Sequence, residues 1–255
     1  MSPDLAAASP APDPWAGLRE FTAARIALGR SGVSVPLRAA LDFRLAHAYA
    51  RDAVYSILDT EYLMAVVAAL EQPMRQVHSR ASTREEYLHR PDYGRQLDNE
   101  SASQLAEPEP TECDLVVVLA DGLSATAVNE HAAPLLSRLL PRLRAAGLRL
   151  GPVVLAEQAR VALGDEVGHR LRAQLVLVLI GERPGLSAPH SLGAYLTFAP
   201  RPGLTDEARN CVSNIRPEGL PYPAAADRLA YLLLEATRRQ LSGVALKDDS
   251  SLMLG

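Results

Sequence analysis

Runs of consecutive apolar residues mark the second half of this chain. Residues 115–120 and 175–180 have no polar face, which is typical of strands covered on both sides in a parallel sheet. Further strands are expected over residues 150–155 and 192–198. Because helical patterns separate these runs, the sequence predicts an α/β fold with a doubly wound, mainly parallel sheet.

Apolar positions at helical spacing predict the intervening helices. One such face spans residues 128–143, where Pro134 and Pro141 are expected to split the helix into two pieces, since an interior proline removes a hydrogen bond and clashes with the preceding turn. Gly147 is expected to cap its end. Two further helices are predicted, over residues 165–171 and 225–236.

The first half of the chain is predicted to be helical. Pro36 can open a helix, and the residues Leu37, Leu41, Leu45 and Ala48 share one of its faces.

Thr83 and Glu86 predict the start of a second helix. These residues fit a capping box, in which a hydroxyl and a carboxylate satisfy the free amide groups of a first helical turn. The helix is expected to end at Arg90, because Pro91 disfavours helical geometry in the residue before it.

Composition shifts divide the chain into three parts. Residues 1–17 are predicted to form a flexible tail, residues 18–111 a helical N-terminal region, and residues 112–255 the sheet domain. The stretch 107–111, with two prolines and two glutamates, is the expected boundary.

Composition, net charge and the number of cysteines exclude several classes of protein. A hydrophobic content of 48% and a charged content of 22% are ordinary for a globular chain, and a net charge of -4 argues against nucleic-acid binding. No apolar segment reaches the roughly 20 residues of a membrane span, and no secretory signal is expected. The two cysteines, Cys113 and Cys211, form no disulfide framework or metal motif and are expected to be reduced thiols.

The loop at residues 181–185 follows the apolar run 175–180 directly. It therefore lies at the carboxyl end of a predicted strand, the edge at which α/β sheets bind ligands, and it presents Glu182 and Arg183. Ligand contact and plain turn chemistry explain this loop equally well at this point. Asp121 and Ser124 follow the other run and favour a helix N-cap.

No self-sufficient catalytic set is visible. The phosphate-loop, dinucleotide-binding and nucleophile-elbow motifs are all absent from the sequence. The six histidines have no partner at ligand spacing, so no metal site is expected. Cys211 is expected to pack rather than to act as a nucleophile. These features indicate a binding module.

Short strings spread from residue 25 to residue 247 resemble one family, the small (light) subunit of ethanolamine ammonia-lyase. They are residues 25–32, 86–95, 118–124, 147–152, 160–166, 180–186, 191–195, 210–215 and 242–247.

The resemblance implies a fold and an activity. It implies a Rossmann-like cobalamin-binding domain in a hetero-oligomeric, adenosylcobalamin-dependent lyase for ethanolamine degradation. Radical deamination would convert ethanolamine to acetaldehyde and ammonia, with ethanolamine bound mainly by the large subunit and this chain inactive alone. The implied location is the bacterial cytoplasm, with a bacterial microcompartment left open.

The same resemblance assigns three cofactor contacts to Val161, Glu182 and Cys211, and assigns no catalytic residue and no metal ligand to this chain. Ala159 departs from the family pattern, in which a glycine commonly stands at this position. The alternative interpretation is a stand-alone Rossmann-like protein that binds a small ligand or nucleotide without catalysis.

Overall fold

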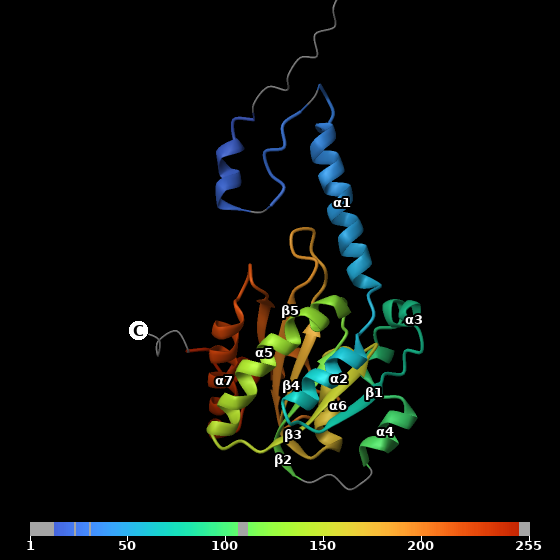
Figure 1. Ribbon diagram of the computed structural model, residues 1–255, viewed down its shortest axis with the longest axis vertical. Helices are drawn as coiled ribbons and strands as arrows, with labels where there is room; N and C mark the ends of the chain where they lie inside the picture. The colour runs from blue at the N-terminus through green and yellow to red at the C-terminus, as the bar shows by residue number, and fades with distance from the viewer. Residues whose placement is uncertain (1–12, 23, 31, 107–111, 250–255) are drawn as a thin grey trace, which may run out of the picture.

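A single six-stranded sheet forms the centre of the molecule (Figure 1). The computed structural model describes residues 13–22, 24–30, 32–106 and 112–249. The spatial order is β1-β3-β2-β4-β5-β6; the first four strands in this order are mutually parallel, and β5 and β6 run antiparallel to their neighbours. The strands are β1 (Met74–His78), β2 (Cys113–Ala120), β3 (Leu150–Glu157), β4 (Ala173–Gly181), β5 (Leu192–Phe198) and β6 (Arg209–Ile215). The predicted α/β class and mainly parallel sheet are confirmed.

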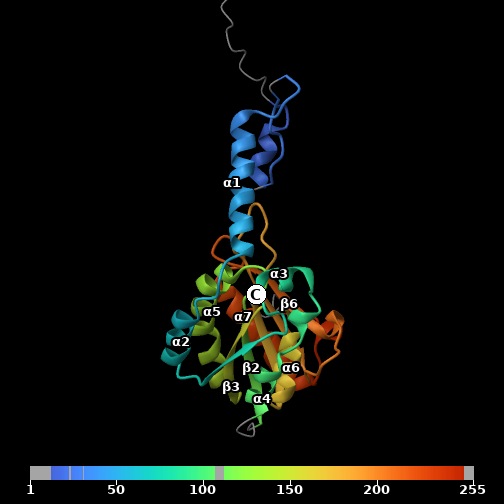
Figure 2. The same ribbon diagram turned by 90° about the vertical axis from the view of Figure 1, so that its right-hand side faces the viewer.

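Helices cover both faces of the sheet (Figures 1 and 2). The α-helices of the described residues are α1 (Leu37–Val54), α2 (Thr60–Ala69), α3 (Arg84–His89), α4 (Asn99–Ala106), α5 (Ala125–Ala145), α6 (Leu163–Arg170) and α7 (Tyr222–Arg239). Helices α2, α5 and α7 share one hydrophobic core with the sheet, and α4 and α6 share the other. The sheet is therefore doubly wound.

The apolar runs lack a polar face because both sides of the central strands are buried. In β2, Leu115, Val117 and Leu119 belong to the core beneath α5, whereas Val116 and Val118 belong to the core beneath α6. The alternation of side chains along a strand sends neighbours to opposite layers, and each layer accepts only apolar groups.

Strand β1 corrects the purely helical prediction for residues 18–111. It pairs in parallel with β3 and forms the edge of the sheet. Only five residues long and with just Val77 buried, it carries no apolar run that the sequence could have revealed. The division at residue 111 stays a prediction, and residues 107–111 and 1–12 lie outside the described part of the chain.

The prediction that Pro134 and Pro141 split the helix was wrong, because α5 is continuous through both. The carbonyl groups that lose their amide partners belong to Glu130 and Ser137, which are exposed residues where solvent can replace the missing bonds. The opposite face is buried against the sheet from Ala125 to Leu143, and this packing holds the helix together.

The predicted caps are confirmed. Thr83 accepts from the N–H of Glu86 at 3.1 Å, although the Glu86 carboxylate returns to Ser82 rather than to Thr83. Ser124 caps α5 by accepting from the N–H of Ala127. Gly147 follows α5 with a φ of 86°, the left-handed conformation that glycine adopts without strain.

Helix α1 begins after Pro36 as predicted, but its expected apolar face is not part of a core. Leu37, Leu41 and Leu45 are 74%, 51% and 53% exposed. The helix extends away from the sheet domain (Figures 1 and 2). A hydrogen bond from Arg25 to the carbonyl oxygen of Leu186 links this region to the β4–β5 loop.

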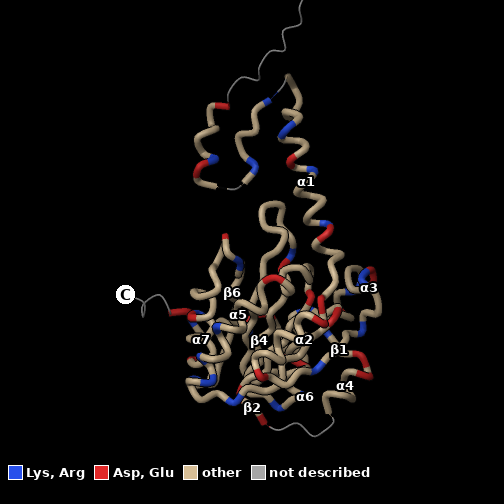
Figure 3. The backbone as a smooth tube through the Cα atoms, in the orientation of Figure 1, with Lys and Arg blue, Asp and Glu red and all other residues tan. Residues whose placement is uncertain are grey.

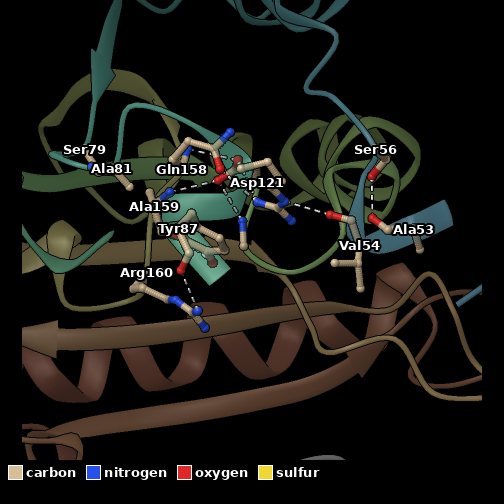
Figure 4. A network of polar contacts seen from close by, with 12 residues as sticks. Ala53, Val54, Ser56, Ser79, Ala81, Tyr87, Asp121, Gln158, Ala159 and Arg160 are labelled. Atoms are coloured by element: carbon tan, nitrogen blue, oxygen red, sulfur yellow. Dashed lines mark hydrogen bonds and ion pairs between the residues drawn. The ribbon is translucent and has the colours of Figure 1, made fainter. Parts of the chain in front are cut away.

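The carboxylate of Asp121, the first residue after β2, joins several segments at the carboxyl edge of the sheet (Figure 4). Its Oδ1 accepts from the N–H groups of Gly122 and Ala159, each at 2.9 Å. Its Oδ2 accepts from the N–H of Gln158 at 2.9 Å and lies 3.4 Å from Nη1 of Arg84, on α3. One buried carboxylate thus fixes the ends of β2 and β3 against α3.

Substitution of Asp121 by alanine tests this arrangement. The change removes the acidic partner of Arg84 and the acceptor of three backbone N–H groups, so we expect the free energy of unfolding to fall by about 3–5 kcal/mol in urea titrations. The matched control is Asp114→Ala, because Asp114 also lies in the β2 segment but pairs with the exposed Arg149. That loss should be about 1 kcal/mol or less. Equal losses in the two variants would contradict the role of Asp121.

Candidate functional site

The order of the strands creates a crevice between the carboxyl ends of β2 and β4. After β2 the chain passes through α5 on one face to reach β3, and after β3 it passes through α6 on the other face to reach β4. The two connections diverge at the boundary between β2 and β4, which are neighbours in the sheet. Such a switch point is where doubly wound sheets bind ligands.

Two glycines bring the loops at this crevice together. The N–H of Leu123 donates to the carbonyl oxygen of Gly181 at 3.0 Å. Gly122 has a φ of +56°, and a Cβ atom on Gly181 would collide with the carbonyl oxygen of Ser124. Larger residues at either position would push the loops apart.

A cavity of about 420 Å³ opens at this point. Val161 and Glu182, two of the three predicted contact residues, both line it, and Arg183 lines it as well. Val161 comes from the segment after β3 and Glu182 from the loop after β4. The remaining lining residues are Tyr87, Gly122, Leu123, Arg160, Ile180, Gly181 and Tyr195.

The two carboxylate oxygens of Glu182 have different surroundings. Oε2 accepts from the hydroxyl of Ser191 at 2.5 Å and from the N–H of Asn214 at 3.2 Å. These bonds tie the loop after β4 to the start of β5 and the end of β6. Oε1 has no hydrogen-bond partner among the residues described. Oε2 therefore stabilises the fold, whereas Oε1 can accept a hydrogen bond from a ligand.

Cys211, the third predicted contact residue, lies beside the cavity rather than in its lining. It stands on β6 opposite Tyr195 of β5, and Tyr195 lines the cavity. Cys211 is an exposed residue of β6. Partial burial of its thiol raises the pKa, a hydrogen bond with the Tyr195 hydroxyl lowers the pKa, and the charge of Glu182 raises it. The net pKa lies above the ordinary value for cysteine, so the thiol is protonated at neutral pH and is a poor nucleophile.

Tyr87 lines the cavity and lies beside the Asp121 network, as Figure 4 shows for the network. Its ring is fully buried, and two guanidinium groups pack on it, that of Arg84 at 4.6 Å and that of Arg160 at 4.2 Å from the ring centroid. Its hydroxyl donates to the carbonyl oxygen of Ala159 at 3.2 Å, and burial raises its pKa. Tyr87 thereby fixes the segment that carries Val161.

A second cavity, of about 620 Å³, adjoins the first. Arg160 and Val161 line both cavities. The second cavity lies between the loop before α4, the start of α6 and the residues before β6. Its other lining residues are Pro91, Arg95, Gln96, Ala162, Glu166, Pro202, Gly203, Leu204, Thr205 and Asp206.

Sequence reasoning missed Tyr87, Arg160 and Tyr195 as parts of the site. Arg160 directly precedes a predicted contact residue, so its position was a usable signal. Tyr87 and Tyr195 reach the cavity only through tertiary packing and strand pairing. Asp121 was expected to be a helix cap, a role that Ser124 fills.

Other features of the molecule do not compete for this assignment. A groove of about 720 Å³ runs along α1, but its lining is mostly aliphatic and includes none of the predicted contact residues. Within the described ranges there is no group of three or more histidine, cysteine or acidic residues arranged for a metal ion, and no helix has the length and apolar character of a membrane span. Basic and acidic residues are interspersed along the backbone (Figure 3).

Comparison with known proteins identifies the family. The model of the family described as ethanolamine ammonia-lyase light chain (EutC) matches residues 12–247. An ethanolamine ammonia-lyase small subunit from Ralstonia nicotianae is 55% identical over 245 residues, which are 95% of this chain and 91% of the relative. A protein of the same name from Rhodopseudomonas palustris is 57% identical over 92% of this chain and 90% of the relative. Another, from Bradyrhizobium diazoefficiens, is 56% identical over 93% of this chain and 92% of the relative. The chain therefore belongs to the ethanolamine ammonia-lyase small-subunit family.

Proposed function

We propose that this chain binds adenosylcobalamin at the crevice between β2 and β4 and shares it with a large catalytic subunit. The complex would convert ethanolamine to acetaldehyde and ammonia by a radical mechanism. The observation that carries the proposal is the convergence of Val161 and Glu182 on one cavity at the switch point of the sheet, with Cys211 one side chain away. Family membership supplies the identity of the cofactor.

The residues present suit a corrinoid. Two adjoining cavities that share Arg160 and Val161 provide room for an extended molecule, and both open to the surface. The Nε atom of Arg160 is buried without a hydrogen-bond partner in the described structure. The hydrogen bonds that described residues donate to Glu182 both end on Oε2, which leaves Oε1 available to a ligand. Val161 offers an apolar contact beside these polar groups.

Each contact residue has a distinct binding role in this proposal. Oε1 of Glu182 accepts a hydrogen bond from an amide or hydroxyl group of the cofactor, while Oε2 keeps the loop in place. Val161 forms an apolar wall, and the protonated thiol of Cys211 makes a neutral contact. When bound, adenosylcobalamin supplies radical chemistry through homolysis of its cobalt–carbon bond, and the protein positions it and excludes side reactions.

The residues that line this cavity suit the binding of a cofactor and not the chemistry of the substrate. The polar side chains that line the cavity either form hydrogen bonds within the fold or are available to a cofactor. The lining residues do not include a general base paired with a nucleophile. Substrate binding and proton transfer are therefore assigned to the large subunit. We place the complex in the bacterial cytoplasm, with a microcompartment as the alternative.

Reconstitution tests the division of labour. The purified chain with adenosylcobalamin should release no acetaldehyde from ethanolamine, and the large subunit alone should be equally inactive. Mixing or coexpression of both chains should produce turnover, measured as acetaldehyde formation. Sustained turnover by the purified small chain would contradict the proposal.

Replacement of Glu182 by glutamine tests the cofactor contact. Glutamine retains an oxygen that can accept from Ser191, so the free energy of unfolding should change little. The loss of a charged acceptor should weaken binding of cobalamin to the reconstituted complex about tenfold, as measured by absorbance titration. Glu85→Gln, an exposed position on α3, is the matched control and should leave affinity unchanged. If both variants bind cobalamin as tightly as the parent complex, Glu182 only stabilises the loop and does not contact the cofactor.

A further inference from the structure

Arg160 stands at the junction of the two cavities and lines both. Its backbone N–H donates to the carbonyl oxygen of Gly94 at 2.7 Å, and its Nη2 donates to the carbonyl oxygen of Tyr87 at 3.3 Å. Its guanidinium stacks on the Tyr87 ring. These contacts hold the side chain in a defined place between α3 and the segment after β3.

No acidic residue in the described part of the chain forms an ion pair with Arg160. Arg84, whose guanidinium also packs on the Tyr87 ring, pairs with Asp121. Arg160 forms no ion pair within the described ranges, and its Nε is buried without a hydrogen-bond partner. Two guanidinium groups thus pack on one ring, and among the described residues only Arg84 has an acidic partner.

The acidic residues of the second cavity are engaged elsewhere. Glu166 lies 2.9 Å from Nη2 of Arg170, and its Oε2 accepts from the N–H of Leu97 at 3.0 Å. Asp206 lies 3.0 Å from Nη1 of Arg209. Neither carboxylate neutralises Arg160.

A guanidinium that is partly removed from water and lacks a counter-charge is costly, and it binds an anion strongly when one arrives. The planar fork of arginine matches the oxygens of a phosphate group in particular. In adenosylcobalamin the corrin side chains end in neutral amides, and the negative charge of the periphery belongs to the phosphodiester of the nucleotide tail. The position of Arg160 therefore indicates where that phosphodiester lies.

We propose that Arg160 binds the phosphodiester of the cofactor, so that the nucleotide tail extends into the 620 Å³ cavity while the corrin side faces Glu182. This inference rests on the proposed function. It adds an orientation of the cofactor and a binding residue that lies next to Val161.

The test compares two corrinoids on the complex of both subunits. Cobalamin carries the phosphodiester, and cobinamide lacks the nucleotide tail with its phosphate. We expect Arg160→Gln and Arg160→Met to weaken binding of cobalamin about ten- to a hundredfold and to leave cobinamide binding within about twofold, as measured by absorbance titration. Arg160→Lys should show an intermediate loss, because it keeps the charge without the fork. Because both ligands share the corrin, a general disturbance of the site lowers both affinities and cancels in their ratio.

Controls separate the possible failures. Arg239→Gln, on the exposed end of α7, should change neither affinity. If the parent complex binds neither corrinoid, the proposed function is wrong. If the parent binds cobalamin and the Arg160 variants keep its preference for cobalamin over cobinamide, the assignment of Arg160 is overturned. Loss of that preference in Arg183→Gln or Arg95→Gln instead would likewise overturn it, since these arginines also line the cavities.

Discussion

The arrangement of this site depends on the buried carboxylate of Asp121. This carboxylate joins the ends of β2 and β3 to α3 through hydrogen bonds and an ion pair with Arg84. Arg84 in turn contacts the end of α1, because its Nε donates to the carbonyl oxygen of Val54 at 2.7 Å. Taking a carboxylate out of water is unfavourable unless its lone pairs are satisfied, and here backbone N–H groups and a guanidinium satisfy them. The same network holds Tyr87 and so defines one wall of the cavity.

The fold supplies the rest of the site through topology. Parallel strands end at one edge, and the divergence of α5 and α6 leaves that edge open between β2 and β4. Gly122 and Gly181 allow the two loops to touch, so residues that lie 60 positions apart in the chain, such as Asp121 and Gly181, form one surface. The exposed apolar positions of α1 and the open cavity are consistent with a chain whose family name denotes one subunit of a larger assembly.

Much of this could be read from the sequence, and the failures have physical causes. The runs at 115–120 and 175–180 identified the central strands because both faces are buried. Capping chemistry identified Gly147 and gave Ser124 as one of two candidate N-caps, the other being Asp121. Strands β1 and β6 were missed because they are the two edge strands of the sheet and carry no apolar run. The continuity of α5 through its prolines was missed because tertiary packing outweighs a local propensity. Val161 and Glu182 were named by resemblance, whereas the unpaired charge of Arg160 became visible only when its neighbours were known.

The central claim is that the carboxyl edge of this sheet forms one half of a cobalamin pocket. Hydrogen exchange of the two-subunit complex, measured with and without cobalamin, tests it most directly. The account predicts that cobalamin slows amide exchange in the segments 158–162 and 180–183 of this chain, with little change in α7. Protection confined to the large subunit, or to α7 and other segments away from this edge, would contradict it.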